Sequence, residues 1–292
     1  MITKEKISRE EFDEKYNWRD LPEVSNPILH TFRIFTKLFL TVFVGIGTLV
    51  ITFIILPVLR ILVHPADKFR CSAQRFISLG FRFILFLLKI TGLADLVTDY
   101  KKEFSSLHSK IVVANHPSIL DTVVLIALIQ NSTVIASEKY SRGILGGIIK
   151  ACYIINSLDF DELCNRCRET LKLGNNVIIF PEGTRTPRHG QNHYKKGAAR
   201  IAKATGTNII PVLIAGSDKF GLGKYNPVLS FNPVEKLLYH VIKLEEIDIS
   251  EYKDLPDPIA AKRITQKYYG SIHAAAEAYK KDHPLTKTVN NF

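Results

Sequence analysis

The pattern of apolar positions divides this chain into two unlike parts. The segment Leu38–Leu59 has no charge in 22 residues, and its only polar side chains are three threonines. As a helix it would extend about 33 Å, enough to cross the hydrocarbon core of a bilayer. The polar residues 1–30 before it, and the lack of a small-residue cleavage site after it, argue against a removable signal peptide. A buried core helix is the alternative, but such helices rarely run this long without a polar edge.

A second apolar stretch, Phe76–Leu93, is of a different kind because it contains cations. Lys68, Arg75, Arg82 and Lys89 are spaced seven apart, so on a helix they form one stripe that drifts only about 20° per heptad. Such a helix could lie at a membrane surface with its cations toward lipid phosphates. It could equally be an ordinary amphipathic helix packed on the rest of the protein. The pattern leaves both interpretations open.

From about Val97 onward, short apolar runs alternate with helical stretches, which predicts an α/β domain. The fold class expected is α/β, a central and mostly parallel sheet flanked by helices, with an N-terminal hydrophobic, membrane-associated helical segment. The predicted strands are Ile111–Ala114, Thr133–Ser137, Val177–Phe180, Asn208–Ile214 and Val228–Phe231. The predicted helices are Ser118–Ile129, Ile144–Ala151, Asp161–Leu173, Gly197–Thr205 and Asp257–Lys281.

These patterns predict four regions. They are a polar segment at 1–30, a membrane-associated helical hairpin at 31–95, a catalytic domain at 96–282 and a loose tail at 283–292.

The charge of the chain narrows the classes of partner. Lysine and arginine number 39 against 28 aspartates and glutamates, a net charge of +11, which favours an anionic partner. The sequence shows no basic stripe rich in aromatic residues, so nucleic acid is not expected. A lipid bilayer and a phosphorylated substrate remain.

The four cysteines do not indicate a disulfide framework. Cys164-x-x-Cys167 resembles half of a zinc site or a redox pair, but no second pair stands at zinc-ribbon distance. Both residues fall in the amphipathic pattern of Asp161–Leu173, which favours two small residues on a helix surface. No metal and no other cofactor is expected.

The first chemical motif follows the apolar run Ile111–Ala114 and places His116 five residues before Asp121. Ser118 and Asp121 have the spacing of a capping box, which predicts a helix start there. His116 would then lie in the turn and Asp121 in the first helical turn. A neutral imidazole suits the removal of a hydroxyl proton at pH 7, and a carboxylate on its other nitrogen would fix the tautomer. Taken alone, a surface histidine and a helix cap would explain the same residues.

The second motif is Phe180-Pro181-Glu182-Gly183-Thr184-Arg185, directly after Val177–Ile179. Gly183 permits a tight turn with close approach of the backbone to a ligand. Glu182 could accept a hydrogen bond from a hydroxyl, and Arg185 offers a planar fork suited to phosphate. Tyr194-Lys195-Lys196-Gly197 follows and adds two cations, although a solvated surface turn explains these lysines equally well.

Together the two motifs resemble the His-x4-Asp and Phe-Pro-Glu-Gly-Thr-Arg blocks of the glycerolipid (1-acylglycerol-3-phosphate) acyltransferases. The resemblance covers roughly residues 111–216. It implies a membrane-bound O-acyltransferase that moves a fatty acyl group from acyl carrier protein or coenzyme A, as co-substrate, to a lysophospholipid hydroxyl in phospholipid biosynthesis. The acceptor it implies is 1-acylglycerol 3-phosphate. The residues it assigns are His116 and Asp121 as catalytic, and Glu182, Gly183, Thr184, Arg185 and Lys195 as substrate-binding.

One departure from the family pattern concerns the acceptor. Members that act on glycerol phosphates usually carry an arginine between the two main blocks, where this chain has Tyr153–Asp159 with an acidic end. Arg166 or Arg168 could substitute, but spacing does not decide this. A different lyso-lipid, or a lipid-linked secondary metabolite precursor, is therefore an alternative acceptor.

Two other classes of function compete with acyl transfer. A metal-dependent hydrolase would use His189 and His193, but Pro187 and Gly190 predict a loop there instead of the helix that this spacing needs. A non-catalytic membrane-surface binding protein is the other rival. It would need neither a base nor the carboxylate that orients it. The sequence also lacks a Gly-x-Ser-x-Gly elbow, which favours direct attack by the acceptor hydroxyl over an acyl-enzyme.

Charge counts predict the orientation of the hydrophobic segment. Arg60, Lys68, Arg70 and Arg75 follow it, whereas only Arg33 and Lys37 stand just before it. The positive-inside bias therefore predicts localisation at the inner (cytoplasmic) membrane, with the catalytic domain facing the cytoplasm. Full spanning and a re-entrant hairpin with the second apolar stretch both remain open.

Overall fold

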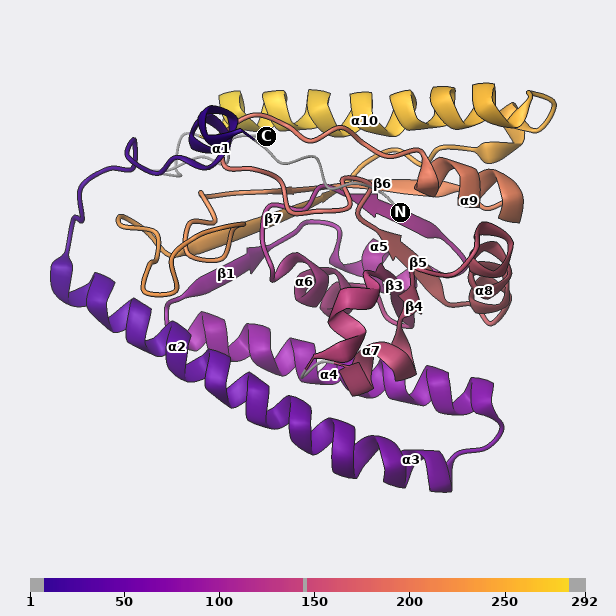
Figure 1. Cartoon of the computed structure of the whole chain (residues 1–292), viewed down its shortest axis with the longest axis horizontal. Coiled ribbons are helices and arrows are strands. Elements are labelled where there is room, and N and C mark those ends of the chain that lie inside the picture. Colours follow the sequence, from indigo (N-terminus) through magenta and orange to yellow (C-terminus); the bar gives the residue numbers. More distant parts are fainter. Residues whose placement is uncertain (1–7, 144–145, 284–292) are drawn as a thin grey trace.

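The computed structural model describes residues 8–143 and 146–283, which build a seven-stranded sheet covered by helices on both faces (Figure 1). The strand order is β1-β7-β6-β2-β5-β3-β4. All neighbours pair parallel except β6 and β7, so the predicted α/β class and mostly parallel sheet are confirmed. The strands are β1 Ala94–Val97, β2 Ile111–Ala114, β3 Ser132–Ala136, β4 Ile154–Ile155, β5 Asn176–Ile179, β6 Ile209–Ala215 and β7 Leu237–Lys243.

The side chains of the central strands alternate between two separate cores. Val113 points into a core shared with α8, α9 and α10, whereas Val112 and Ala114 point into a core shared with α4 and α6. Because both faces are covered, these strands are apolar without interruption, as parallel strands usually are. The helices of the domain are α5 Lys101–Ser106, α6 Asp121–Leu128, α7 Gly146–Cys152, α8 Phe160–Lys172, α9 Gly197–Thr205 and α10 Asp257–Asp282, with 3₁₀ turns at Glu138–Arg142 and Ile249–Tyr252.

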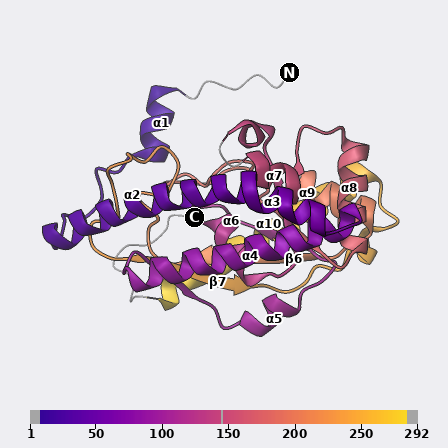
Figure 2. The ribbon, with the colours of Figure 1, turned by 90° about the horizontal axis from the view of Figure 1, so that it is seen from below.

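The predicted hydrophobic helix is longer than its uncharged segment. It begins at Pro27, where the Asn26 side chain accepts a hydrogen bond from the Leu29 N–H at 3.0 Å, and it consists of α2 (Pro27–Val50), a π-helical stretch (Ile51–Ile55) and α3 (Leu56–Leu62). A turn then leads into α4 (Ala66–Ile90), which lies beside it (Figure 2). Both the Pro27–Leu62 helix and α4 are long and apolar enough to cross a membrane.

The α2–α3 helix follows the domain along its length. Near its start the Ser25 N–H donates to Pro233 O, and further along the Lys37 ammonium donates to three carbonyls of the 221–230 loop, with two of the distances at 2.6 Å. Near its end, Leu56 joins a core cluster with Ala73 and Ile148. The helix therefore lies against the domain and does not project from it.

The four residues of the cationic stripe of α4 are exposed, and two of them bond to the domain. The Arg82 Nε donates to Ala127 O at 2.9 Å, and the Arg75 Nε donates to the Asn131 side chain at 3.0 Å. Large, exposed apolar side chains lie next to this stripe on α4, with Leu79 four residues after Arg75 and Phe86 four residues after Arg82. Of the two interpretations of this pattern, packing on the domain accounts for these two arginines.

The predicted strand Val228–Phe231 is wrong, and the sheet contains β7 in its place. Val228 and Leu229 are 72 % and 69 % exposed in a loop, and two carbonyls of this loop accept hydrogen bonds from Lys37. Sequence patterning also missed β1 and the short β4. Of the predicted helix Ile144–Ala151 the first two residues lie outside the described part, as does all of the predicted tail except His283.

Residues 8–25 contact the domain. Helix α1 (Arg9–Tyr16) and the segment after it pack on the domain. The Tyr16 ring, 5 % exposed, meets the Tyr225 ring edge-on with centroids 4.8 Å apart. Trp18 lies near Phe220, with ring centroids 6.4 Å apart. The polar N-terminal segment therefore borders the loops that follow β6.

Candidate active site

The two sequence motifs meet because their strands are neighbours. Strands β2 and β5 pair in parallel, with Val113 opposite Ile179, so the residues after their carboxyl ends emerge at the same edge of the sheet. Beyond this edge the His116 ring stacks on the Phe180 ring, with centroids 4.2 Å apart and planes 20° apart. The side chain of Asn115 bonds to both the N–H and the C=O of Ile214, which ties the end of β2 to β6.

His116 and Asp121 form a hydrogen-bonded pair. The His116 Nδ1 lies 2.8 Å from the Asp121 Oδ2, and Asp121 is completely buried. A carboxylate only accepts, so this contact fixes the Nδ1–H tautomer of the neutral ring and leaves its lone pair on Nε2. Nε2 has no hydrogen-bond partner among the residues that the structure describes, and the side chain is 18 % exposed. The pair therefore has the geometry of a base and its orienting carboxylate.

Ser118 contacts the carboxylate but does not start the helix as predicted. Helix α6 begins at Asp121, and its N-cap residue Leu120 makes no side-chain cap. The Ser118 N–H donates to Asp121 Oδ2 at 2.7 Å and its hydroxyl donates to Oδ1 at 2.7 Å. Because the hydroxyl proton of Ser118 is donated to the carboxylate, the serine holds Asp121 in place.

The side chain of Glu182 links the two motifs by hydrogen bonds. Its Oε1 accepts from the His116 N–H at 2.9 Å and from the Thr186 hydroxyl at 2.7 Å, and its Oε2 accepts from Asn192 Nδ2 at 2.7 Å. Burial raises the pKa of this carboxyl, and the three hydrogen bonds oppose that shift. Glu182 is 3 % exposed and both its oxygens are engaged, so it holds the histidine backbone and the following loop. Its predicted contact with the acceptor stays a prediction.

The second motif continues in a tight turn at Gly183. Gly183 has φ +66°, and a Cβ there would come within 2.7 Å of the Lys195 Nζ. The Lys195 ammonium therefore lies over this turn, and its contact with a substrate stays a prediction. The Arg185 Nη1 donates to Leu222 O at 3.1 Å and to Gly223 O at 2.7 Å, and Thr184 between them is partly exposed.

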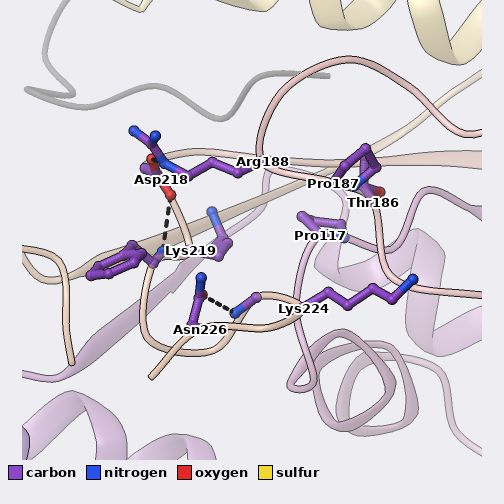
Figure 3. A pocket seen from close by; sticks show the side chains of 10 residues that line it. Pro117, Thr186, Pro187, Arg188, Asp218, Lys219, Lys224 and Asn226 are labelled. Carbon is purple, nitrogen blue, oxygen red and sulfur yellow. Dashed lines mark hydrogen bonds and ion pairs between the residues drawn. The ribbon is translucent and has the colours of Figure 1, made fainter. Parts of the chain in front are cut away.

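A hollow borders the histidine turn at Pro117 (Figure 3). It measures about 360 Å³ with the space open to solvent included, and its wall also contains Lys224 and Arg188. Arg188 is bonded on both sides: its Nε donates to Asp218 at 2.7 Å, and its Nη1 binds Asp20 of the N-terminal segment. Residues 8–25 thus supply part of the surroundings of this hollow.

Neither metal alternative receives support from the geometry. Among residues 8–143 and 146–283, no group of three His, Cys, Asp or Glu side chains is placed to hold an ion. His189 and His193 lie in a loop. Cys164 and Cys167 are free and buried in the core, not on a helix surface, and burial raises the pKa of Cys167 to about 12.

The two candidate replacements for the missing arginine lie away from this site. Arg166 pairs with Glu162 on α8, and Arg168 donates to Ala204 O near the carboxyl end of α9. Helix α9 starts beside the site at Gly197 and is about 13 Å long. Asp159, the acidic residue near the expected arginine, is the N-cap of α8 and accepts from the Glu162 N–H at 2.9 Å.

Sequence reasoning missed several residues of the site. Phe180 and Asn115 lie inside the motifs, and their positions at the strand ends could have indicated contact with His116. Tyr239, whose hydroxyl lies 2.9 Å from the Ser118 Oγ, comes more than a hundred residues later on a strand that was not predicted. Only the sheet order brings it here.

Comparison with known proteins identifies the same segment. A family model described as "Acyltransferase" matches residues 97–215. The chloroplast 1-acyl-sn-glycerol-3-phosphate acyltransferase of Arabidopsis thaliana is 27% identical over 226 residues, which cover 73% of this chain and 60% of that protein. The chloroplast enzyme of the same description from Brassica napus is 25% identical over 213 residues, covering 67% of this chain and 59% of that protein. The chain thus spans about three fifths of the length of these curated relatives.

The fold also has a solved counterpart. The crystal structure of the 1-acyl-sn-glycerophosphate acyltransferase of Thermotoga maritima superposes with a TM-score of 0.64 and 22% identity, covering 85% of this chain and 98% of that one. Since it matches nearly the whole of that protein, the hairpin and the sheet domain are parts of one shared architecture. Both motifs stand at adjacent strand ends inside the segment that the family model matches, and this segment is similar to the 1-acyl-sn-glycerol-3-phosphate acyltransferases.

Proposed function

We propose that this protein transfers a fatty acyl group from an acyl thioester to the hydroxyl of a lysophospholipid. The observation that carries the proposal is the His116–Asp121 pair, with Nδ1 bonded to a buried carboxylate at 2.8 Å and Nε2 directed elsewhere. A histidine held in this way is suited to accept a proton at Nε2. The names of the relatives supply the reaction class.

The reaction needs one base and one acid, and His116 supplies both. Its Nε2 removes the proton of the acceptor hydroxyl while the oxygen attacks the thioester carbonyl. The imidazolium that forms is stabilised by Asp121. When the tetrahedral intermediate collapses, the carbon–sulfur bond breaks and the thiolate takes the proton back from Nε2. The products are the ester and the free thiol, and His116 is neutral again.

The acceptor we propose is 1-acylglycerol 3-phosphate. Arg185 and Lys195 place two cations at the turn beside His116, and guanidinium and ammonium groups favour a phosphate. The acceptor named for the relatives in Arabidopsis and Brassica is of this kind. An acceptor with another headgroup is the alternative, because the arginine usual between the main motifs is absent here and the acidic helix cap Asp159 stands near its place.

The helical hairpin is proposed to dock the enzyme on one leaflet of a membrane. The α2–α3 helix has 36 residues and would extend about 54 Å, against about 30 Å for the hydrocarbon core. It contacts the domain from Ser25 to Leu56, so a perpendicular crossing would draw the domain into the bilayer. Lying flat, the hairpin would expose its apolar side to acyl chains and bring lipid acceptors to the site.

The proposal also includes the acyl donor and the side of the membrane on which the domain lies. Acyl carrier protein and coenzyme A thioesters are the proposed donors. The positive charges after the hydrophobic helix favour a domain that faces the cytoplasm. Labelling of a cysteine introduced near residue 200 tests this orientation, and labelling from outside intact cells would contradict it.

Replacement of the proposed base is the direct test of function. His116→Ala should lower kcat for acyl transfer at least about a hundredfold, the usual contribution of a general base, while the protein stays folded. His193→Ala, an exposed histidine of the loop after the second motif, is the matched control and should keep its activity. Turnover close to that of the unmodified protein in His116→Ala would refute the mechanism.

A panel of acceptors tests the substrate. Glycerol 3-phosphate, lysophosphatidic acid, zwitterionic lyso-lipids and uncharged lipid alcohols would compete for acyl thioester with the solubilised enzyme. Preference for lysophosphatidic acid, lost in Arg185→Ala, supports the proposed acceptor. Preference for an uncharged alcohol would remove the phosphate from the proposal and leave the role of His116 intact. Turnover of none of the acceptors would favour the non-catalytic membrane-surface alternative.

A further inference from the structure

The carboxylate of Asp121 is held on its second oxygen by a buried chain of hydroxyl groups. The Ser118 hydroxyl donates to Oδ1 at 2.7 Å, and the Tyr239 hydroxyl lies 2.9 Å from the same Ser118 Oγ. Since the serine proton is directed to the carboxylate, the Tyr239 O–H must be the donor in the second contact. Hydrogen bonds in such a chain polarise and strengthen one another. Tyr239 therefore contacts the pair through a directed relay that ends on Asp121.

A buried lysine lies at the far end of this relay. Lys219 is 2 % exposed, and its ammonium lies 4.7 Å from the centroid of the Tyr239 ring. Its Nζ donates to three carbonyls, Ser217 O at 2.5 Å, Leu238 O at 2.7 Å and Ala215 O at 3.3 Å. An ammonium has three donors and no acceptor, so three carbonyls match the charged form. A neutral amine would direct its lone pair at a carbonyl oxygen.

The charges around Lys219 connect it with the catalytic pair. Burial lowers the pKa of Lys219 to about 7, and Asp121 is the first of three carboxylates that oppose this shift, followed by Asp218 and Glu235. Burial together with the charge of Asp121 also raises the pKa of Tyr239, which keeps its hydroxyl a donor.

Asp121 itself is buried, and a buried carboxylate is costly without a partner of opposite charge. While His116 is neutral it supplies no such charge. Glu182, whose carboxyl also interacts with His116, is another anion. The cations Arg185 and Lys195 lie at the turn after β5, whereas the charge of Lys219 interacts with the Asp121 carboxylate itself.

We infer that Lys219 and Tyr239 are positioning residues of the acyl-transfer reaction: Lys219 balances the charge of Asp121, and Tyr239 fixes its orientation through Ser118. Asp121 then stays ionised beside a neutral imidazole, the state in which Nε2 can accept a proton. The inference rests on the proposed function for its kinetic consequences. The protonation of His116 that it predicts does not depend on turnover.

Removal of the lysine charge should make the pair take up a proton at higher pH. Without the cation, the site around His116 and Asp121 is more negative, so its protonated form is favoured whichever residue holds the proton. In Lys219→Met, the acid limb of the pH–rate profile should move up by about one pH unit, as expected for the loss of a nearby charge. In Tyr239→Phe, kcat should fall by about tenfold, the effect of one hydrogen bond in a charged network, with the acceptor KM unchanged.

Two measurements on the full chain separate positioning from stability. The first is the NMR titration of the His116 ring, assigned by its disappearance in His116→Gln, in the unmodified protein, Lys219→Met and Tyr239→Phe. The second is the pH–rate profile of the same proteins. Tyr279→Phe and Lys203→Met are the controls. Tyr279 is a buried tyrosine on α10, and Lys203 bonds to Asp257 outside the site. Both controls should leave the titration and the profile in place.

The outcomes distinguish the inference from the proposed function. An upward shift of the His116 titration in folded Lys219→Met supports the inference even if no acceptor turns over. An unchanged titration and an unchanged acid limb in the folded variant overturn it. If Lys219→Met does not fold, Tyr239→Phe decides: a fall in kcat with constant KM supports the relay, and unchanged kcat refutes it.

Discussion

Helices α4 and α10 cover opposite faces of the same sheet, yet they present opposite surfaces to their surroundings. They have similar lengths, 25 and 26 residues, and each buries one side against the strands. The outward side of α10 carries exposed charged and polar residues, Lys262, Arg263, Gln266 and Lys267. The outward side of α4 carries exposed Phe76, Leu79, Phe83, Phe86 and Ile90.

The cations of the two helices also differ in the groups that they contact. On α10, Lys267 pairs with Glu251 at the surface. On α4, the exposed Arg82 donates to a backbone carbonyl of α6. An exposed helix surface with this many large apolar side chains is typical of a helix that contacts an apolar partner. Comparing the two helices therefore separates a layer with a polar outer surface from a layer with an apolar outer surface.

The same asymmetry extends over the whole hairpin. Beside α4, the helix α2–α3 exposes a stripe of large apolar side chains. We call these residues together with those of α4 the outer apolar face; on α2–α3 they include Phe32, Phe35, Phe39, Ile46, Phe53 and Ile61. The two helices that carry these residues lie side by side (Figure 2), and contiguous apolar patches are rare on soluble monomeric proteins.

The strongest test places charge on the outer apolar face. Phe39 and Phe83, one on each helix, are 68 % and 50 % exposed. Burial of a phenylalanine in an apolar medium contributes about 1.5–3 kcal/mol, so Phe39→Glu with Phe83→Glu should weaken binding to phosphatidylcholine vesicles by at least about a hundredfold. Sedimentation with vesicles measures this.

The matched control is an exposed apolar residue on the other layer. Ile259 of α10 is 45 % exposed, and Ile259→Glu should bind vesicles as the unmodified protein does. Equal loss in both proteins would show that the two layers do not differ in their contact with lipid.

The sequence predicted the sheet layer far better than the orientation of the hairpin. The strand β2 and the helix α9 have the bounds expected, because their apolar runs end at polar or glycine residues. The meeting of His116 with the second motif was also predictable, since both motifs follow parallel strands. Periodicity placed the cations of α4 on one stripe but did not show whether that stripe faces lipid or the domain.

What remained beyond prediction depends on contacts distant in sequence. The run Val228–Phe231 has the composition of a strand, but tertiary contacts with Lys37 hold it as a loop. The contacts of Glu182 with Thr186 and Asn192 could not be predicted, because these two partners carry no pattern of their own. Lys219 reaches the catalytic pair only through the order of strands in the sheet.

The hydrogen bond between Arg82 of α4 and the backbone of α6 should contribute measurably to the free energy of unfolding. Arg82 donates to Ala127 O at 2.9 Å in the last turn of α6, where a cation also favours the helix dipole. Arg82→Met should lower the free energy of unfolding by about 1–2 kcal/mol, measured by denaturant titration in detergent. Lys267→Met on α10 removes an exposed ion pair and should change it by less than about 0.5 kcal/mol. Similar effects in both variants would mean that the cations of α4 are as solvated as those of α10.

The smallest expected effect distinguishes headgroup contact from packing at Arg75. A cation near an anionic membrane contributes about 1 kcal/mol to binding, so an arginine that touched lipid phosphates would weaken binding about fivefold when removed. Arg75 instead donates to the Asn131 side chain at 3.0 Å, and Arg75→Met should change binding to vesicles with anionic lipid by less than about twofold. Parallel titrations with neutral and anionic vesicles measure this. Weakening confined to the anionic vesicles would show that the cationic stripe reaches the headgroups despite its contact with the domain.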